Sequence, residues 1–189
     1  MDQGILSDTF GAYKLISLTK EQFAKVDPQD YDWLSKCVWR AWWSKNTQSY
    51  YAFGTGDNRL KLMHRMIIGA TDPKQHGDHI NHDTLDNRRT NLRVCSNAEG
   101  VRNRRPWGVL GTKGVTYISC KGGQFQYWRA RINCNGKQFG LGYFPFTEDG
   151  KIEAATAYNI AAKEHFGEFA FLNDIEKMKR NATSTTPTN

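Results

Sequence analysis

The stretch DHINHDTLDNRRTNLRVCSNAEGVRNRR occupies residues 78–105 and decides the organisation of the first half of the chain. It begins with Asp, Asn and His side chains, which are typical of loops because their short polar groups bond to nearby backbone atoms. It continues into Ser96-Asn97-Ala98-Glu99, a capping box in which serine and glutamate satisfy each other's free backbone N–H groups. The pattern predicts a polar loop followed by a helix from Ser96 to about Arg104.

The same loop contains groups suited to phosphodiester hydrolysis. The Asp78 carboxylate is of the type that binds a hard divalent cation, and the adjacent His79 imidazole has a pKa suited to taking a proton from water. An amide such as Asn91 can bond to one ring nitrogen and leave the other free. The residues alone leave a second interpretation open, in which they serve only turns and helix caps.

The residues before this loop predict a small hydrophobic core. Two alternating runs, at residues 13–18 and 49–53, predict short strands. Between them lies a group of large aromatic residues, which bury much apolar surface per residue. Stacking on nucleobases is the alternative use of these rings. The group consists of Tyr31, Trp33, Trp39, Trp42 and Trp43.

Five short motifs resemble, in order and spacing, those of the HNH endonucleases of phages and mobile elements. The motifs are Met63-His64-Arg65, Asp78-His79-Ile80-Asn81, Leu85-Asp86-Asn87-Arg88, Asn91-Leu92-Arg93 and Arg102-Asn103-Arg104. By this resemblance, residues 1–105 form a nuclease module with its HNH core at about 63–105, in which a β-hairpin packs on a helix around one divalent ion, Mg²⁺ or alternatively Mn²⁺. The resemblance assigns His79 as general base, Asp78 as a metal ligand and Asn91 as the residue that orients His79.

One position departs from the family pattern. The second metal ligand of the family, usually Asn or His, lies nine residues after Asn91, where this chain has Gly100. Glycine has no ligand atom and destabilises a helix by roughly 1 kcal/mol relative to alanine. Three interpretations follow: an engineered inactivation, a naturally degenerate enzyme, or relocation of the ligand role. Asn97 and Asn103 lie on the same helical face as Gly100, and Asn103 is the candidate for relocation.

The second half of the chain is strongly basic. Between Gly100 and Thr147 there is no Asp or Glu, whereas eight Lys or Arg residues occur there among aromatic and glycine residues. Such a block is typical of a surface that binds a polyanion, and the alternative is an ordinary solvated basic face.

The second half also predicts a sheet covered by one helix. Strands are expected near residues 115–119, 126–134 and 137–143, with a hairpin turn at Asn135-Gly136. An alanine-rich helix is expected at 152–166, ending at Gly167. Trp128, Ala130 and Ile132 alternate with Arg129, Arg131 and Asn133, which predicts one apolar and one cationic sheet face.

Residues 113–173 resemble the Apetala-type, or ethylene-response-factor, DNA-binding domain. The matching segments are Lys113-Gly114-Val115, Trp128-Arg129-Ala130, Leu141-Gly142-Tyr143-Phe144, Glu153-Ala154-Ala155, Ala157-Tyr158 and residues 166–173. Thr116 and Ile118 stand where plant members carry arginines, so sequence preference is not carried over. We expect a linker at 106–112, a disordered tail at 174–189, and DNA contacts from Arg102, Arg104, Arg105, Lys113, Thr116, Arg129, Arg131, Asn133 and Lys137.

The sequence as a whole predicts an α+β, homing-type endonuclease that nicks double-stranded DNA or cleaves both strands. We expect this endonuclease to be a cytoplasmic monomer, located in the host cell if a phage encodes it. No apolar run or signal peptide indicates a membrane or secretory role, and the four cysteines are scattered, which predicts reduced, mostly buried thiols. Two rival functions remain open, namely sequence-directed DNA binding without cleavage, and RNA binding through the basic sheet.

Overall fold

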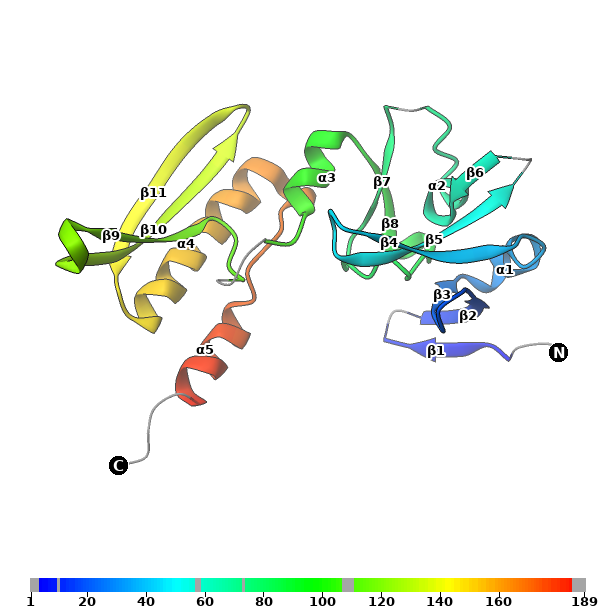
Figure 1. Cartoon of the computed structure of the whole chain (residues 1–189), viewed down its shortest axis with the longest axis horizontal. Helices are drawn as coiled ribbons and strands as arrows, with labels where there is room; N and C mark the ends of the chain where they lie inside the picture. The colour runs from blue at the N-terminus through cyan, green and yellow to red at the C-terminus, as the bar shows by residue number, and fades with distance from the viewer. Residues whose placement is uncertain (1–3, 10, 57–58, 73, 107–110, 185–189) are drawn as a thin grey trace. The chain divides into compact units, whose positions relative to one another are not determined.

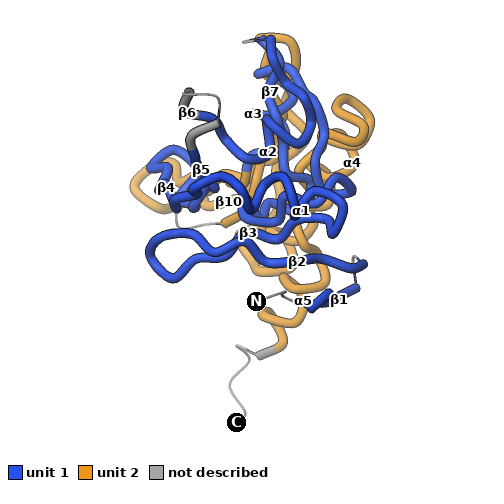
Figure 2. The backbone as a smooth tube through the Cα atoms, turned by 90° about the vertical axis from the view of Figure 1, so that its right-hand side faces the viewer, with its two compact units in different colours: residues 1–104 blue, residues 105–189 orange. Residues whose placement is uncertain are grey.

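The computed structural model describes residues 4–9, 11–56, 59–72, 74–106 and 111–184. Its helices and antiparallel sheets agree with the predicted α+β class. The chain divides into two compact units, residues 1–104 and 105–189, which are coloured separately in Figure 2. Among the described residues, the first unit contains one buried apolar cluster and the second contains two, so each unit has the means to fold around its own core. Most of the predicted linker, residues 107–110, lies outside the described residues.

In its described part, the first unit contains antiparallel sheets and short helices (Figure 1). Strands β1, β2 and β3 form one sheet, β4, β5 and β6 a second, and β7 and β8 a two-stranded hairpin. The bounds are β1 Leu6–Asp8, β2 Gly11–Ser17, β3 Phe23–Val26, α1 Pro28–Leu34, β4 Trp39–Ser44, β5 Ser49–Gly56, β6 Arg59–Leu62, α2 Met63–Ile67, β7 His76–His79, η1 Arg89–Asn91, β8 Leu92–Cys95 and α3 Asn97–Asn103.

The aromatic group contributes less to the core than predicted. Trp39 is buried and Tyr31 packs against the core, as expected. Trp33, Trp42 and Trp43 are instead 36%, 51% and 43% exposed, so the prediction is wrong for these three. For Trp42 the reason is alternation along β4, because Trp39 and Ala41 occupy the inner face and Trp42 falls on the outer one.

The predicted polar loop and helix take the form of a hairpin followed by α3. The loop between β7 and β8 contains η1, and α3 packs against both strands. Ser96 caps α3, since its hydroxyl accepts from the Glu99 N–H while the Glu99 carboxylate accepts from the Ser96 N–H. The capping-box prediction is therefore confirmed.

The second unit is a three-stranded antiparallel sheet, in the order β11-β10-β9, with α4 packed against one face (Figure 1). The bounds are β9 Val115–Cys120, η2 Lys121–Gly123, β10 Phe125–Cys134, β11 Lys137–Pro145, α4 Glu148–Phe166, η3 Gly167–Phe169 and α5 Ile175–Ser184. Asn135 and Gly136 have φ of 51° and 76°, the left-handed geometry that a tight hairpin turn requires. The predicted hairpin is confirmed.

The predicted disorder of the tail is wrong for residues 175–184, which form α5. Ile175 and Met178 lie three residues apart, on one side of the helix, and pack against the cluster around Trp128. Asp174 accepts a hydrogen bond from the Lys177 N–H at 2.9 Å and so caps the first turn. Residues 185–189 lie outside the described part of the chain.

Candidate functional site

Asp78 and His79 end strand β7, and their side chains leave it in opposite directions because side chains alternate along a strand. Asp78 lies on the side of α3, where Asn103 Nδ2 donates to Asp78 Oδ2 at 2.9 Å. His79 is buried on the side of α2, where its ring centroid lies 4.9 Å from that of His64. The strand end therefore presents a carboxylate on one side and an imidazole on the other.

The His79 ring is held in one tautomer by Asn87, which is buried. Asn87 Nδ2 donates to the Leu85 carbonyl at 3.1 Å, so its Oδ1 faces His79 Nε2 at 3.3 Å. An amide oxygen only accepts, and Nε2 must therefore carry the proton, leaving the lone pair on Nδ1. Burial lowers the pKa of His79, against the opposing effects of Asn87 and nearby carboxylates. A neutral ring with a free Nδ1 is the form that a general base requires.

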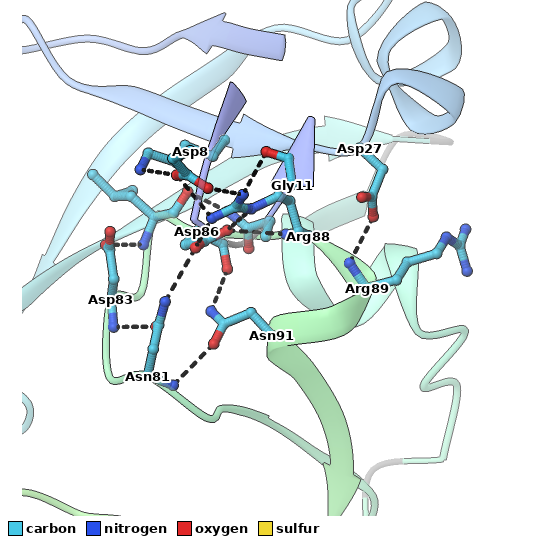
Figure 3. Close-up of polar contacts among 12 residues, drawn as sticks. Asp8, Gly11, Asp27, Asn81, Asp83, Asp86, Arg88, Arg89 and Asn91 are labelled. Atoms are coloured by element: carbon cyan, nitrogen blue, oxygen red, sulfur yellow. Dashed lines mark hydrogen bonds and ion pairs between the residues drawn. The ribbon is translucent and has the colours of Figure 1, made fainter. Parts of the chain in front are cut away.

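Asn91 has a different partner from the one predicted. Its Oδ1 accepts from the Asn81 N–H at 2.9 Å, and its Nδ2 donates to the Asp86 carbonyl at 2.7 Å. The side chain thus closes the loop between β7 and β8 (Figure 3) and makes no hydrogen bond to the His79 ring. The amide that contacts the His79 ring is that of Asn87, whereas the Asn91 amide bonds to the loop.

Arg88 ties this loop to the N-terminal strand (Figure 3). The side chain is 1% exposed, and its Nη2 donates to Asp86 Oδ2 at 2.7 Å while Nη1 donates to Asp8 Oδ1 at 2.7 Å. Asp86 also accepts from Asn81 Nδ2 at 3.1 Å. A buried guanidinium is stable only when acceptors of opposite charge replace its lost hydration, as Asp86 and Asp8 do here. The same network fixes the loop that supports His79.

The loop is also held by backbone bonds and by α1. The Lys25 N–H donates to the Leu85 carbonyl, and the Asn87 N–H donates to the Lys25 carbonyl, both at 2.8 Å, so this part of the loop lies beside β3. Arg89 forms two hydrogen bonds of 2.8 Å to the Asp30 carboxylate of α1. Arg88 and Asn87 fall within a quoted family motif, but their partners were not predictable because Asp8 and Lys25 are distant in sequence.

The α3 side of the site carries an incomplete set of metal ligands. Asp78 Oδ2 already accepts from Arg93 Nε, Arg93 Nη2 and Asn103 Nδ2. Asn103 is buried and presents its amide hydrogens, not its oxygen, to the carboxylate. Over the residues that the structure describes, no three His, Cys, Asp or Glu side chains gather to hold a metal ion. The residues present do not fit a hard divalent cation, which takes several oxygen ligands.

Gly100 faces the same region. A Cβ at this position would lie 3.4 Å from Cys95 Sγ, an ordinary contact, so the backbone leaves space for a side chain here. Burial raises the pKa of Cys95 to about 11, and the sulfur is therefore a neutral thiol at neutral pH. Asn97, the other asparagine of this face, is exposed.

The outer face of the second unit's sheet carries most of the predicted DNA contacts of that unit. Trp128, Ala130 and Ile132 are buried against α4, which confirms the predicted inner face. Arg129 stands between Thr116 on β9 and Tyr143 on β11, and its buried Nε has no hydrogen-bond partner among the described residues. Arg131 and Asn133 both contact Gln138. Tyr127 and Tyr143 join the same face with ring centroids 5.1 Å apart, and strand alternation could have revealed them.

The remaining predicted DNA contacts lie elsewhere. Lys137 is exposed at the start of β11. Lys113 lies just before β9. Its backbone N–H donates to Asn173 Oδ1, and its Nζ lies 5.3 Å from the Phe171 ring centroid. Arg102 belongs to α3, and Arg104 and Arg105 are exposed after it. The structure therefore distributes these residues over both units.

The chain is similar to a protein of Acanthamoeba polyphaga mimivirus that is named as an uncharacterized HNH endonuclease. The two are 29% identical over 177 residues, which is 93% of this chain and 87% of the viral protein. An alignment of this length spans both units. No family model and no solved structure matches the chain. No helix within the described residues has the length and apolar character needed to cross a membrane.

Proposed function

We propose that this chain is a DNA endonuclease of the HNH type with its own DNA-binding unit. The observation that carries the proposal is the end of β7, where Asp78 lies against α3 and His79 is held by Asn87 with a free Nδ1. The mimivirus protein supports it, because the similarity extends over both units and that protein is named an HNH endonuclease.

The proposed chemistry uses residues of this chain. His79 Nδ1 takes a proton from the water that attacks the scissile phosphate, while Asn87 keeps Nε2 protonated. As the new P–O bond forms, the bond from phosphorus to the leaving sugar oxygen breaks, and that oxygen takes a proton from solvent. The loop network of Arg88 and Asn91 keeps the ring at the strand end. In the HNH family a divalent ion supplies charge stabilisation, but the ligand set here is incomplete, and we therefore expect slow cleavage.

Substrate binding is assigned to the outer face of the β9-β10-β11 sheet. Guanidinium groups bond both to phosphates and to guanine edges, and a narrow antiparallel sheet fits a major groove. Arg129 lies in the middle of this face between Thr116 and Tyr143, and Arg131 and Asn133 continue the same side of β10. A monomer with one site cuts one strand in each binding event, so nicking is the expected first product.

The test is cleavage of supercoiled plasmid with Mg²⁺ or Mn²⁺ by this chain and by Gly100→Asn. We expect slow or no nicking by the chain itself, and an increase of orders of magnitude in the variant, because the added amide oxygen completes the ligand set. His79→Ala in the Gly100→Asn background should abolish the gain. If the chain already cuts efficiently and Gly100→Asn changes nothing, the ion is held by other residues, with Asn103 first to test.

A second candidate function is DNA binding without cleavage, as a repressor or decoy. It is favoured by Gly100 and by the engagement of Asp78 with Arg93, which together leave little for a cation to bind. In that case this chain and Gly100→Asn both bind duplex DNA, and neither cuts it with Mg²⁺ or with Mn²⁺.

A further inference from the structure

Three rings from separate elements meet behind the end of β7. They are Tyr51 of β5, His64 of α2 and His79 of β7, and the Tyr51 centroid lies 5.8 Å from that of His64 and 6.1 Å from that of His79. His64 and His79 meet edge to face, with an interplanar angle of 72°. A second imidazole therefore lies beside the proposed general base.

His64 is unusual among the buried polar residues here. The residue is 5% exposed, and its ring packs against the rings of Tyr51 and His79. No hydrogen bond joins its ring nitrogens to another described residue, and these nitrogens are not among the fully buried unpartnered atoms in the described part of the chain. An edge of the ring is therefore open to a group from outside the chain.

The backbone of β7 is adapted to admit this ring. A Cβ on Gly77 would lie 2.4 Å from His64 Cδ2 and 3.2 Å from His64 Nε2. The φ of Gly77 is not in the left-handed region, so conformational freedom does not explain the glycine. The absence of a side chain at this point lets the imidazole approach the strand that carries His79.

We propose that His64 is a further catalytic residue, whose imidazole N–H donates a hydrogen bond to a non-bridging oxygen of the scissile phosphate. The inference rests on the proposed endonuclease function and adds a group that contacts the substrate on the His79 side. Burial, His79 and Arg65 lower the pKa of His64 well below its usual value, so the ring is neutral and has one N–H to give. A fixed donor of this kind is worth about 10²–10³ in rate, because charge builds up on the phosphate oxygens as bonds change.

The kinetic test is made in the Gly100→Asn background with supercoiled plasmid. His64→Phe keeps a ring in the cluster but removes both nitrogens, and we expect kcat to fall about 100-fold or more at unchanged DNA affinity. His64→Gln keeps an N–H and should recover part of the loss. The same change at exposed His165 of α4, which stacks on Phe139, is the control and should have no effect. Equal cleavage by His64→Phe and its parent would overturn the inference.

A binding readout separates this inference from the endonuclease function. The His64 imidazole resonances are followed by ¹⁵N NMR in the full chain while a 30-base-pair duplex, on the order of three helical turns, is added. We expect the N–H signal of His64 to shift on saturation, and Gly77→Ala, which fills the space of the ring, to remove that shift. No shift at saturating duplex refutes the contact even if Gly100→Asn cuts DNA. A shift without cleavage by either protein would show that His64 contacts DNA, but it would refute both the endonuclease function and the catalytic role of His64.

Discussion

Arg88 shows at the level of single residues how the site loop is stabilised. Its guanidinium is buried between Asp86, which is 2% exposed, and Asp8, which is 26% exposed. We expect Asp86→Asn to lower the free energy of unfolding by about 3–5 kcal/mol, because a buried charge loses its more buried partner. Asp8→Asn should cost less, because water reaches that end of the network. Urea unfolding of both variants checks this order, and equal losses would contradict it.

Asp30 gives the first unit a predictable response to acid. Burial raises the pKa of the Asp30 carboxyl, but hydrogen bonds from Arg89 and Trp33 outweigh this effect and leave the pKa below its usual value. A carboxyl with a lowered folded-state pKa adds stability above its unfolded pKa of about 4, and that stability is lost as the pH falls through the folded value. Melting temperatures measured from pH 6 down to about pH 2 should therefore fall less steeply for Asp30→Asn than for the parent. Exposed Asp72→Asn is the control, and an unchanged slope in Asp30→Asn would refute the argument.

At the level of elements, β10 has two faces with separate tasks. Trp128 is 5% exposed and its indole N–H donates to the Thr147 carbonyl, so Trp128→Ala should destabilise the second unit by roughly 3–5 kcal/mol. Arg129→Ala and Arg131→Ala should leave the melting temperature nearly unchanged and weaken DNA binding by about 1–3 kcal/mol each if they contact bases. Calorimetry and fluorescence anisotropy measure the two effects. Exchanged outcomes would mean that the strand faces the other way.

The elements that were predictable from sequence are those with local signals. The capping box at Ser96, the turn at Asn135-Gly136 and the alternation in β10 each depend on residues within a few positions, and each is confirmed. Helix α5 was missed because its stability comes from the contact of Ile175 and Met178 with a core that is distant in sequence. An isolated polar segment of ten residues is not expected to form a stable helix from its intrinsic helix propensity alone.

The candidate site shows the same division between local and distant information. Asp78 and His79 were proposed from their chemistry and from the family resemblance. The partners that fix them were not, because Arg88 reaches Asp8 over 80 residues of sequence and His64 meets His79 only through folding. The bonds of Asn91 to the Asn81 N–H and the Asp86 carbonyl were not predicted, for the same reason. Residue type reveals what a side chain can do, whereas its partner depends on the fold.

At the level of the whole molecule, the two compact units predict a division of labour. Cores that lie within residues 1–104 or within 105–189 should allow each fragment to fold alone. Because α5 packs on the second core, the binding fragment must include residues up to 184. We expect fragment 105–189 to bind duplex DNA, and fragment 1–104 to bind it weakly.

The salt dependence of DNA binding tests most directly whether the second unit carries the binding. Most of the acid-free basic block, which lies between Gly100 and Thr147, belongs to the second fragment, and each phosphate it neutralises releases counterions. The logarithm of the association constant should fall linearly with the logarithm of the salt concentration, with a slope of about −0.9 for each phosphate contacted. Fragment 105–189 and the full chain should give nearly the same slope in anisotropy titrations from about 50 to 200 mM salt. If fragment 105–189 is folded by circular dichroism and binds no DNA, while fragment 1–104 binds as tightly as the full chain, DNA recognition belongs to the first unit. The outer face of the sheet then has another function.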